Sequence, residues 1–344
     1  MSICEIGSEY HYIPINNKTN EKISMFNVID EAYTFSGRTA IEVVLQNLTG
    51  IKKALIPSYC CDSMIVPFRE ANIEVEFYDV FWDNGLKEKI DIKNDVDLVL
   101  WCNYFGFKRP MPDFSRFIAR GGIVLEDITH SYLSDSPFHS QSQYIIASIR
   151  KWFPLICGGY CASLVGKLQN KPMLEVPNEY IDTKKLAMKQ KAMYLINDDS
   201  IIKDEYMNNF SWSNHWLANN YSGLRIDQES KDYIDAIDIS EIKSIRKRNA
   251  LVVYEYLNKN EEVFPIFEEL DVDCPLFVPI VCTSKMKRDE LRQELISQKV
   301  YCPIHWPTPK YNCNSNLYDL ELSLICDQRY NEEDMKRMMQ IFCK

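Results

Sequence analysis

The stretch Ile123-Val124-Leu125-Glu126-Asp127-Ile128-Thr129-His130 decides the fold. Its continuous apolar start is typical of a strand that is buried on both faces of a parallel sheet. The two acids follow the apolar residues, so they lie at the carboxyl end of the strand, where open α/β sheets bind their ligands. An acid there can bind a metal, act as a base or pair with a cationic ring nitrogen. The alternative is a solvated loop acid beside a hydrogen-bonded histidine.

Other short apolar runs flank this stretch and alternate with helical patterns. The runs at 54–57, 75–80 and 96–103 predict strands. Apolar residues at helical spacing from Ile41 to Leu48 predict a helix that Gly50 ends. Shorter helices are expected at 64–71 and 112–120. This alternation indicates a mostly parallel sheet with helices on both faces.

The middle and the C-terminal part of the chain have a different pattern. Long charged helices are expected at about 183–197 and 239–258. After residue 260, the expected elements are strands at 276–282 and 320–326, a helix at 285–298, an extended segment at 300–305, and a last helix capped by Asn331 with Asp334 at its third position. The sequence therefore predicts an α/β protein with a large domain over residues 1–245 and a small α+β domain over residues 246–344.

The composition is that of an ordinary globular chain. Its 344 residues carry 39 Lys and Arg against 49 Asp and Glu, a formal net charge of −10. This balance argues against a general nucleic-acid binder, which needs a basic surface. No apolar run approaches the ~20 residues of a membrane span, and the N-terminal residues lack the basic and apolar regions of a signal peptide. The 12 cysteines are expected to be reduced thiols in a cytoplasm, and without any CxxC motif no metal site is expected.

Two further segments have residue types that can hold a ligand. Ser36, Gly37 and Arg38 directly precede the helix that starts near Ile41, and free N–H groups at a helix start bind phosphate. The alternative is a plain helix cap. Lys151 follows the apolar run 144–149, and a semi-buried lysine has a lowered pKa and can form a Schiff base. The alternative is a surface lysine beside an aromatic ring.

A fourth segment, Tyr301–Pro307, has two prolines that bracket His305 and Trp306. It either lines a pocket or caps the small domain. The order of the other three segments is more informative: a phosphate site, an acid after a strand, a lysine after the next strand, and then Gly158-Gly159. Pyridoxal phosphate needs these parts in this order in the fold-type I enzymes.

At these segments the chain resembles the DegT/DnrJ/EryC1/StrS family of pyridoxal-phosphate enzymes, which are mostly nucleotide-sugar aminotransferases. The resemblance covers most of the chain, and its matching segments are 35–40, 55–63, 126–130, 147–152 with Gly158-Gly159, and 302–307. It implies the fold of a fold-type I pyridoxal-phosphate-dependent transferase. It also implies a homodimer, because the family completes each cofactor site with residues from the neighbouring subunit.

The resemblance implies roles for individual residues. Lys151 would bind the cofactor covalently and later move the proton, Asp127 would pair with the pyridinium nitrogen, and His130 would lie near the phenolic oxygen. The phosphate would be held by the turn that Ser36 starts and by three residues: Gly37, Arg38 and Ser148. Either Tyr59 or Cys61 would cover the ring, and the sequence leaves that choice open.

The chain departs from the family pattern in its phosphate segments. Ser148 lies three residues before Lys151, whereas the usual spacing is five, and Arg38 stands where threonine is usual. Some relatives replace the lysine by histidine and act as dehydratases. Lys151 counts against that chemistry.

The resemblance implies an aminotransferase that moves the amino group of glutamate, or of a similar donor, to a keto-sugar nucleotide in the biosynthesis of a surface polysaccharide. One alternative is another pyridoxal-phosphate reaction, namely decarboxylation or transamination of a small phosphorylated keto compound. The other is a ligand-binding relative without turnover. Arg225 and Arg329 are candidates to bind an anionic substrate group, unless they are surface arginines paired with a nearby acid. His305 and Trp306 are further candidates, and the expected partners are small molecules, with no nucleic acid and no membrane.

Overall fold

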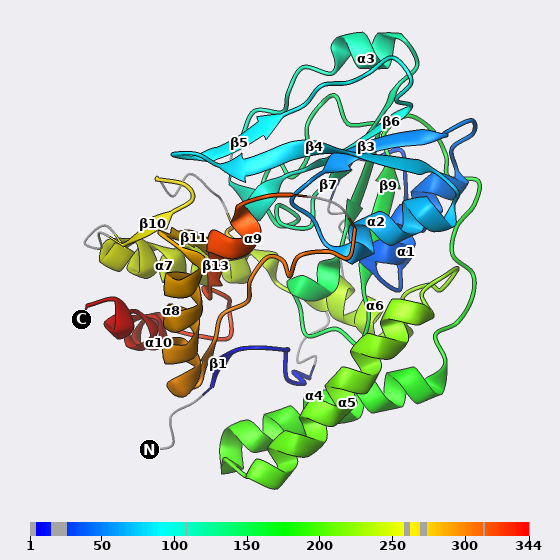
Figure 1. Cartoon of the computed structure of the whole chain (residues 1–344). Helices are drawn as coiled ribbons and strands as arrows, with labels where there is room; N and C mark the ends of the chain where they lie inside the picture. The colour runs from blue at the N-terminus through cyan, green and yellow to red at the C-terminus, as the bar shows by residue number, and fades with distance from the viewer. Residues whose placement is uncertain are drawn as a thin grey trace.

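The computed structural model describes residues 5–14, 26–107, 109–257, 262–268, 274–311 and 314–343 (Figure 1). These residues contain an eight-stranded sheet, a three-stranded sheet and a two-stranded ladder. The eight-stranded sheet has the order β2-β9-β8-β7-β6-β3-β4-β5. Its strands are β2 (Asp30–Thr34), β3 (Lys53–Pro57), β4 (Glu74–Trp82), β5 (Leu86–Lys89), β6 (Leu98–Cys102), β7 (Ile123–Asp127), β8 (Tyr144–Ala147) and β9 (Gly159–Ser163).

The predicted strands are confirmed, and they form the parallel centre of the large sheet. Strands β4, β3, β6, β7 and β8 are parallel neighbours. The edge strands β2 and β5 and the inner strand β9 are antiparallel to their neighbours, which the alternation of strands and helices does not predict. The reason is local: a tight turn with Asn84 and Gly85 at positive φ joins β4 to β5, and residues 148–158 join β8 to β9 without a crossover α-helix.

Helices α1 (Gly37–Gln46), α2 (Asp62–Glu70) and α3 (Ser115–Ala119) belong to the large sheet. Helix α2 connects β3 to β4, and α3 connects β6 to β7, so the two connections run in opposite directions along the sheet. Right-handed connections therefore place α2 and α3 on opposite faces, as Figure 1 shows. The reversal between β3 and β6 opens a crevice at the carboxyl ends of these strands.

Two long helices, α4 (Asn178–Asn197) and α5 (Ser200–Asn219), form an antiparallel hairpin beside the sheet. The sequence predicts the C-terminal part of α4 but not α5. The sequence of α5 is rich in Asn, Ser and aromatic residues, which are weak helix formers, so packing against α4 rather than local preference stabilises it. A shorter helix, α6 (Gln228–Ala236), follows the loop that leaves α5.

The C-terminal part of the chain surrounds a small antiparallel sheet of β10 (Val263–Pro265), β11 (Val278–Cys282) and β13 (Glu321–Leu324). Its helices are α7 (Ile239–Leu257), α8 (Lys285–Ser297), α9 (Leu317–Leu320) and α10 (Glu332–Met339). Asn331 and Asp334 form the capping box of α10, as predicted. The predicted end of α7 at Asn258 lies outside the described residues. The predicted domain boundary at residues 245 and 246 falls inside α7, so this helix spans it.

The N-terminal segment lies against the part of the chain around the small sheet, which we call the small domain. Strand β1 (Ile6–Gly7) pairs in parallel with β12 (Val300–Tyr301), which is the ordered start of the extended segment predicted at 300–305. Three single turns complete the elements: η1 (Tyr104–Gly106), η2 (Ile149–Lys151) and η3 (Gln340–Cys343). None of the described helices is long and apolar enough to cross a lipid bilayer.

The buried apolar residues form two clusters. The first is continuous from the large sheet to the small one, and it includes Val99 of β6, Ile280 of β11 and Met338 of α10. The second packs the turn η2 against α4 and α5, and it includes Trp152 and Phe210. Burial of these side chains is the main force that holds η2 and the small domain against the sheet.

Gly159 lies where a side chain has no room. A Cβ there would lie 2.1 Å from the backbone oxygen of Ser36, the N-cap residue of α1. Gly159→Ala is expected to lower the free energy of unfolding by roughly 2 kcal/mol or more, because a backbone carbonyl cannot yield without moving α1. Gly166→Ala is the control, since no atom lies within 4 Å of its Cβ position. Urea unfolding measures both variants, and equal stabilities would contradict the close contact.

Candidate active site

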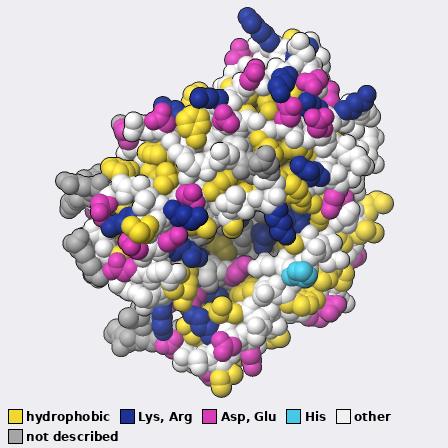
Figure 2. Space-filling view, in the orientation of Figure 1, with side chains coloured by type: hydrophobic (Ala, Val, Ile, Leu, Met, Phe, Trp, Pro, Cys, Tyr) yellow, Lys and Arg dark blue, Asp and Glu magenta, His cyan; other side chains and the backbone are white. Residues whose placement is uncertain are grey.

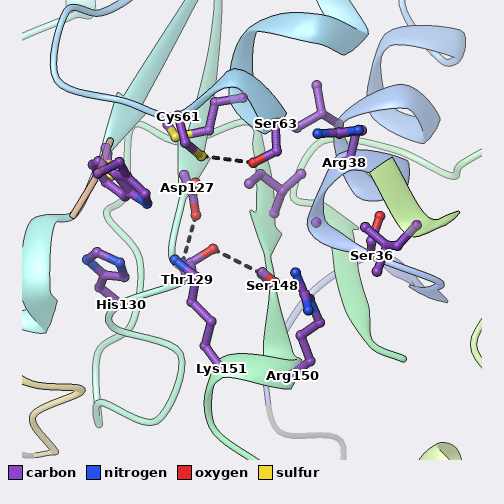
Figure 3. A pocket seen from close by; sticks show the side chains of 17 residues that line it. Ser36, Arg38, Cys61, Ser63, Asp127, Thr129, His130, Ser148, Arg150 and Lys151 are labelled. Atoms are coloured by element: carbon purple, nitrogen blue, oxygen red, sulfur yellow. Dashed lines mark hydrogen bonds between the residues drawn. The ribbon is translucent and has the colours of Figure 1, made fainter. Parts of the chain in front are cut away.

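The carboxyl ends of β3, β6, β7 and β8 and the N-terminus of α1 surround a cavity of about 260 Å³ (Figure 3). It lies at the crevice that the reversal of the sheet order opens. The residues that line it are Ser36, Gly37, Arg38, Ile41, Cys61, Ser63, Met64, Cys102, Asp127, Thr129, His130, Ile146, Ser148, Arg150, Lys151, Leu217 and Trp306. The structure thus brings together the predicted acid, lysine, histidine and helix start.

Lys151 ends the turn η2 that follows β8, and its side chain extends into the cavity (Figure 3). Burial lowers the pKa of its ammonium group, with the negative charge of Asp127 acting in the opposite direction. Its Nζ lies 5.5 Å from the ring centroid of Trp306 and forms no ion pair with the residues that the structure describes. A larger share of this amine is therefore neutral and nucleophilic than in an exposed lysine.

Asp127 is the last residue of β7 and is only 6% exposed. Its Oδ1 accepts a hydrogen bond of 2.8 Å from the backbone N–H of Thr129. Burial raises the pKa of the carboxyl group, whereas the Thr129 bond and the charge of Lys151 lower it. A buried carboxylate with little compensation favours a cationic group of a ligand beside it.

Thr129 ties the aspartate loop to the lysine turn. Its backbone N–H holds Asp127, its Oγ1 accepts a hydrogen bond of 2.9 Å from Ser148 N, and its carbonyl accepts one of 2.6 Å from Trp152 Nε1. One residue therefore sets the distance between the two strand ends that present Asp127 and Lys151. No local pattern in the sequence reveals this role of Thr129, because its partners are 19 and 23 positions away.

His130 is fixed by the turn η1, which follows β6. Its Nδ1 accepts a hydrogen bond of 2.9 Å from Phe105 N, so a neutral ring has its proton on Nε2. Burial, together with the charge of Lys151, lowers the pKa of this imidazole well below its usual value. A Cβ on Gly106 would lie 2.3 Å from the carbonyl oxygen of His130, so this glycine permits the close approach. The result is a neutral hydrogen-bond donor that lines the cavity.

The opposite end of the cavity has the character of an anion site. The Ser36 side chain caps α1 by accepting a hydrogen bond from Thr39 N. Gly37 lies close to the lysine segment, since a Cβ on Gly37 would lie 3.0 Å from Ser148 Cβ. Arg38 donates from Nη1 to the carbonyl of Ala218 in α5. Its Nε and the Nε of Arg150 are buried without a hydrogen-bond partner. A helix N-terminus flanked by two guanidinium groups suits a phosphate.

The choice that the sequence left open between Tyr59 and Cys61 has a geometric answer. Cys61 lines the cavity, with its Sγ 2.8 Å from Ser63 Oγ. Tyr59 is fully buried and does not line the cavity, because its ring packs under Trp306 with 5.1 Å between the ring centroids. Cys61 is therefore the one of the two that can contact a ligand in the cavity.

A second cavity, of about 510 Å³, adjoins the first and shares Arg150 and Lys151 with it. Its other lining residues come from the N-terminal segment and the small domain: Ser8, Glu9, Tyr10, Arg246, Leu276, Phe277, Arg292, Tyr301, Cys302, Pro303, His305, Ile325, Asp327 and Arg329. Lys151 therefore stands between a small inner cavity and a larger outer one.

His305 belongs to a buried hydrogen-bonded chain in the outer cavity. Ser323 Oγ donates to Glu321 at 2.5 Å and so accepts from His305 Nδ1 at 2.8 Å. Burial lowers the pKa of His305 despite the opposing effect of Glu321. The neutral ring thus has an unprotonated Nε2. The predicted candidates His305 and Trp306 both reach the site, His305 in the outer cavity and Trp306 in the inner one.

The two predicted arginines have other partners. The guanidinium of Arg225 pairs with Glu175, its side chain is 52% exposed, and it lines neither cavity, as the alternative with a surface arginine paired to an acid expects. Arg329 lines the outer cavity but forms an ion pair of 2.7 Å with Asp327 and donates to backbone carbonyls of the N-terminal segment. Its N–H groups anchor that segment, as the alternative reading with a paired acid expects.

Among the described residues, no group of three or more His, Cys, Asp or Glu side chains is arranged to hold a metal ion. The site therefore consists of amine, imidazole, carboxylate, thiol and guanidinium groups around the two cavities.

Comparisons with known proteins identify the architecture. No protein-family model and no curated protein matches the chain. Solved structures match it over nearly its whole length. The sugar aminotransferase CalS13 from Micromonospora echinospora aligns with a TM-score of 0.59 and 11% identity, over 90% of this chain and 86% of its own. DesI, solved in the presence of its TDP-sugar product, aligns with a TM-score of 0.60 and 13% identity. The alignment covers 90% of this chain and 79% of DesI.

The chain has the type I aminotransferase fold. A third similar structure, the GDP-4-keto-6-deoxy-D-mannose-3-dehydratase of E. coli with bound hydrated PLP, has a TM-score of 0.62 and 14% identity, over 92% of this chain and 88% of its own. Since an aminotransferase and a dehydratase both have the type I fold, the fold alone leaves the reaction open. The reaction therefore has to be inferred from the side chains of the site.

The lowered pKa of Lys151 predicts a pH-dependent stability. Because the folded pKa lies below the unfolded one, the unfolded chain binds more protons between the two values, and stability rises with pH there. In protein freed of small ligands, Lys151→Met is expected to be more stable than the wild type at pH 7. The difference should shrink as the pH approaches the unfolded pKa, about 10.4.

Thermal unfolding at several pH values measures this difference. Lys167→Met removes a lysine from an exposed position of the same domain and is the control for the loss of one charge. If the stability of Lys151→Met relative to the wild type equals that of the control at every pH, the result would contradict a buried amine.

Proposed function

We propose that this chain is a pyridoxal-phosphate-dependent aminotransferase. The observation that carries the proposal is the convergence of Lys151, Asp127 and the N-terminus of α1 on one cavity. When bound, pyridoxal phosphate supplies an aldehyde that links to amines and a ring that accepts electrons. The fold is shared with structures that contain this cofactor.

The residues of the inner cavity fit this cofactor. A phosphate dianion matches the end where Gly37 and Ser148 touch and where Arg38 and Arg150 have buried, unpartnered Nε groups. A protonated ring nitrogen matches the buried carboxylate of Asp127. The arginine at position 38, which departs from the family pattern, supplies the positive charge that a threonine would lack.

The chain's own residues then have separate tasks. The Lys151 amine acts as a nucleophile and carries a proton on Nζ, since its lowered pKa makes both protonation states accessible. The carboxylate of Asp127 stabilises a positive charge on a ligand group that lies beside it. His130 donates a hydrogen bond from Nε2, and its orientation is fixed by Phe105. The buried Trp306 beside Lys151 helps to exclude water from the amine.

We infer that the amino donor is glutamate or a similar amino acid and that the acceptor is a keto-sugar nucleotide used for a surface polysaccharide. Two observations support this acceptor. Similar structures are a sugar aminotransferase and a protein solved with its TDP-sugar product. The outer cavity offers about 510 Å³ beside Lys151, and arginines line it. A lysine rather than a histidine at position 151 favours amine transfer over dehydration.

We also propose a cytoplasmic homodimer whose partner subunit completes the cofactor site. Exposed apolar side chains on the α4–α5 hairpin support an association surface: Met193 is 51% exposed, Ile196 81% and Ile201 69%. Light scattering is expected to give about twice the chain mass of 40.3 kDa. A fully active monomer at assay concentrations would contradict the dimer.

Covalent labelling tests the central proposal. After incubation with pyridoxal phosphate and reduction with borohydride, peptide mapping is expected to find the label on Lys151. Lys151→Ala should keep its fold and lose turnover by roughly 10³-fold or more. A label on another lysine would remove the assignment, and a protein that takes no label would favour the ligand-binding alternative.

Asp127→Asn separates cofactor binding from chemistry. The variant is expected to take up the label but to lose roughly 10²–10³ in turnover, the size of effect seen when a preorganised polar group is removed. Asp79→Asn, at an exposed position of β4, is the control. Assays with glutamate and keto-sugar nucleotides report amine transfer, whereas release of CO₂ would indicate decarboxylation. Near wild-type turnover of Asp127→Asn would exclude Asp127 as the partner of the ring nitrogen.

A further inference from the structure

The outer cavity concentrates positive charge in an acidic protein. Four arginines and Lys151 line it, against the two carboxylates of Glu9 and Asp327. The whole chain has a formal net charge of −10. In Figure 2, Lys and Arg side chains gather around the central hollow of the visible face. A concave site with a local excess of one charge attracts ligands of the opposite charge.

Two of the four arginines are fully engaged in the structure. Arg246 is 0% exposed and donates to the carbonyls of Pro275 and Leu276, to Gln328 and to the Tyr10 hydroxyl. Arg329 is held by Asp327 and by carbonyls of the N-terminal segment. Their N–H groups are therefore used for structure, and a ligand would have to compete with these bonds.

Arg292 of α8 differs from both. Its Nε is buried without a hydrogen-bond partner, and its guanidinium forms no ion pair within the described part of the chain. By contrast, Arg288, one turn earlier on α8, donates to the carbonyls of Tyr318 and Glu321 and pairs with Asp289. A buried guanidinium nitrogen without a partner is unfavourable unless a ligand supplies the acceptor.

Uncharged residues line the cavity together with Arg292. It lines the wall with Tyr301, Cys302 and Pro303, none of which is a carboxylate. Burial raises the pKa of the Cys302 thiol to about 12, and the charge of Arg292 acts on that thiol in the opposite direction. The two carboxylates that line the cavity, Glu9 and Asp327, pair with Lys184 and Arg329, so no ion pair among the described residues neutralises Arg292.

Arg150, the remaining arginine, lines both cavities and has the same kind of unpartnered Nε. It lies next to the anion end of the inner cavity, beside Ser148 (Figure 3). Arg292 therefore lines the outer cavity alone, whereas Arg150 lines both.

We propose that Arg292 binds an anionic group of the substrate, a carboxylate or a phosphate, while the reacting group of that substrate lies at Lys151. The inference rests on the proposed function, which makes Lys151 the reacting amine. A planar guanidinium pairs with either anion through two parallel hydrogen bonds. Two sources have this chemistry: the carboxylate of the amino donor and the diphosphate of a sugar nucleotide.

Calorimetric titration with two probes distinguishes these sources without any turnover. Glutarate has the two carboxylates of glutamate but no amine, and UDP has the diphosphate of a sugar nucleotide. The purified full chain is titrated as the wild type, Arg292→Gln, Arg292→Lys and Lys285→Gln. Lys285 lies on α8 with a side chain that is 62% exposed, so its variant removes one positive charge from the helix outside the cavity.

Arg292→Gln is expected to bind at least one probe about tenfold more weakly or worse, since it loses a charge-assisted bidentate pair. Arg292→Lys should lose less, and Lys285→Gln should bind like the wild type. Loss for glutarate alone assigns the site to the donor carboxylate, loss for UDP alone assigns it to the acceptor diphosphate, and loss for both assigns it to an anion that the two substrates share.

Two results would overturn the inference: a wild type that binds neither probe, or an Arg292→Gln variant that binds both like the wild type. Circular dichroism checks that each variant is folded. If Arg292→Gln does not fold, Arg292→Lys decides, and wild-type affinity of that variant for both probes overturns the inference. Failure of the proposed function would appear as the absence of a label on Lys151, which these titrations do not depend on.

Discussion

The contact between the N-terminus of α1 and the strand that follows the lysine turn is the constraint on which the site depends. At Gly159 the backbone of β9 comes so close to Ser36 that a side chain has no room. At Gly37 the first turn of α1 touches Ser148 in the same way. These two contacts place the free N–H groups of a helix directly beside the turn that presents Lys151. The distance between the N-terminus of α1 and the backbone of the lysine turn is therefore set by packing of the main chain.

The remaining parts of the site extend this rigid pair. Thr129 connects the aspartate strand to the lysine turn, and the turn after β6 holds His130 in one tautomer. The groups that take part in the proposed chemistry thus come from adjacent parallel strands, whose carboxyl ends the topology brings to one edge. The small domain contributes the opposite wall, with His305 held by Ser323 and Glu321.

The sequence predicts those parts of the fold that depend on local pattern. The buried strands β3, β6 and β7 are continuous apolar runs, and Asn331 caps its helix through residues three positions apart, so each signal is local. Helix α5 has weak local preference and is stabilised by its neighbour α4, so its pattern did not predict it. The antiparallel edge strands depend on how their connections turn back.

In the site, too, the sequence predicts the features that depend on local pattern and misses those that depend on distant contacts. Asp127, His130 and Lys151 follow predicted strands, so the common edge of the sheet brings them together as expected. The choice between Tyr59 and Cys61 depends on where Trp306 packs, about 245 positions later in the chain. Arg225 and Arg292 have the same charge, and only their contacts separate a surface ion pair from a guanidinium whose Nε is buried without a hydrogen-bond partner. Such distinctions depend on contacts between distant residues, which no single window of sequence contains.

The N-terminal segment that lines the outer cavity has a consequence for how the protein is assembled. Strand β1 pairs with β12, and Gly7 N donates to the Tyr330 hydroxyl across 323 positions of sequence. Lys191 and Arg329 bind the carbonyls of the same segment. During synthesis on the ribosome, residues 5–10 emerge well before their binding partners near residues 300 and 330. The outer cavity therefore gains its complete wall only after the residues near 300 and 330 have been translated, and the inner cavity likewise waits for Trp306.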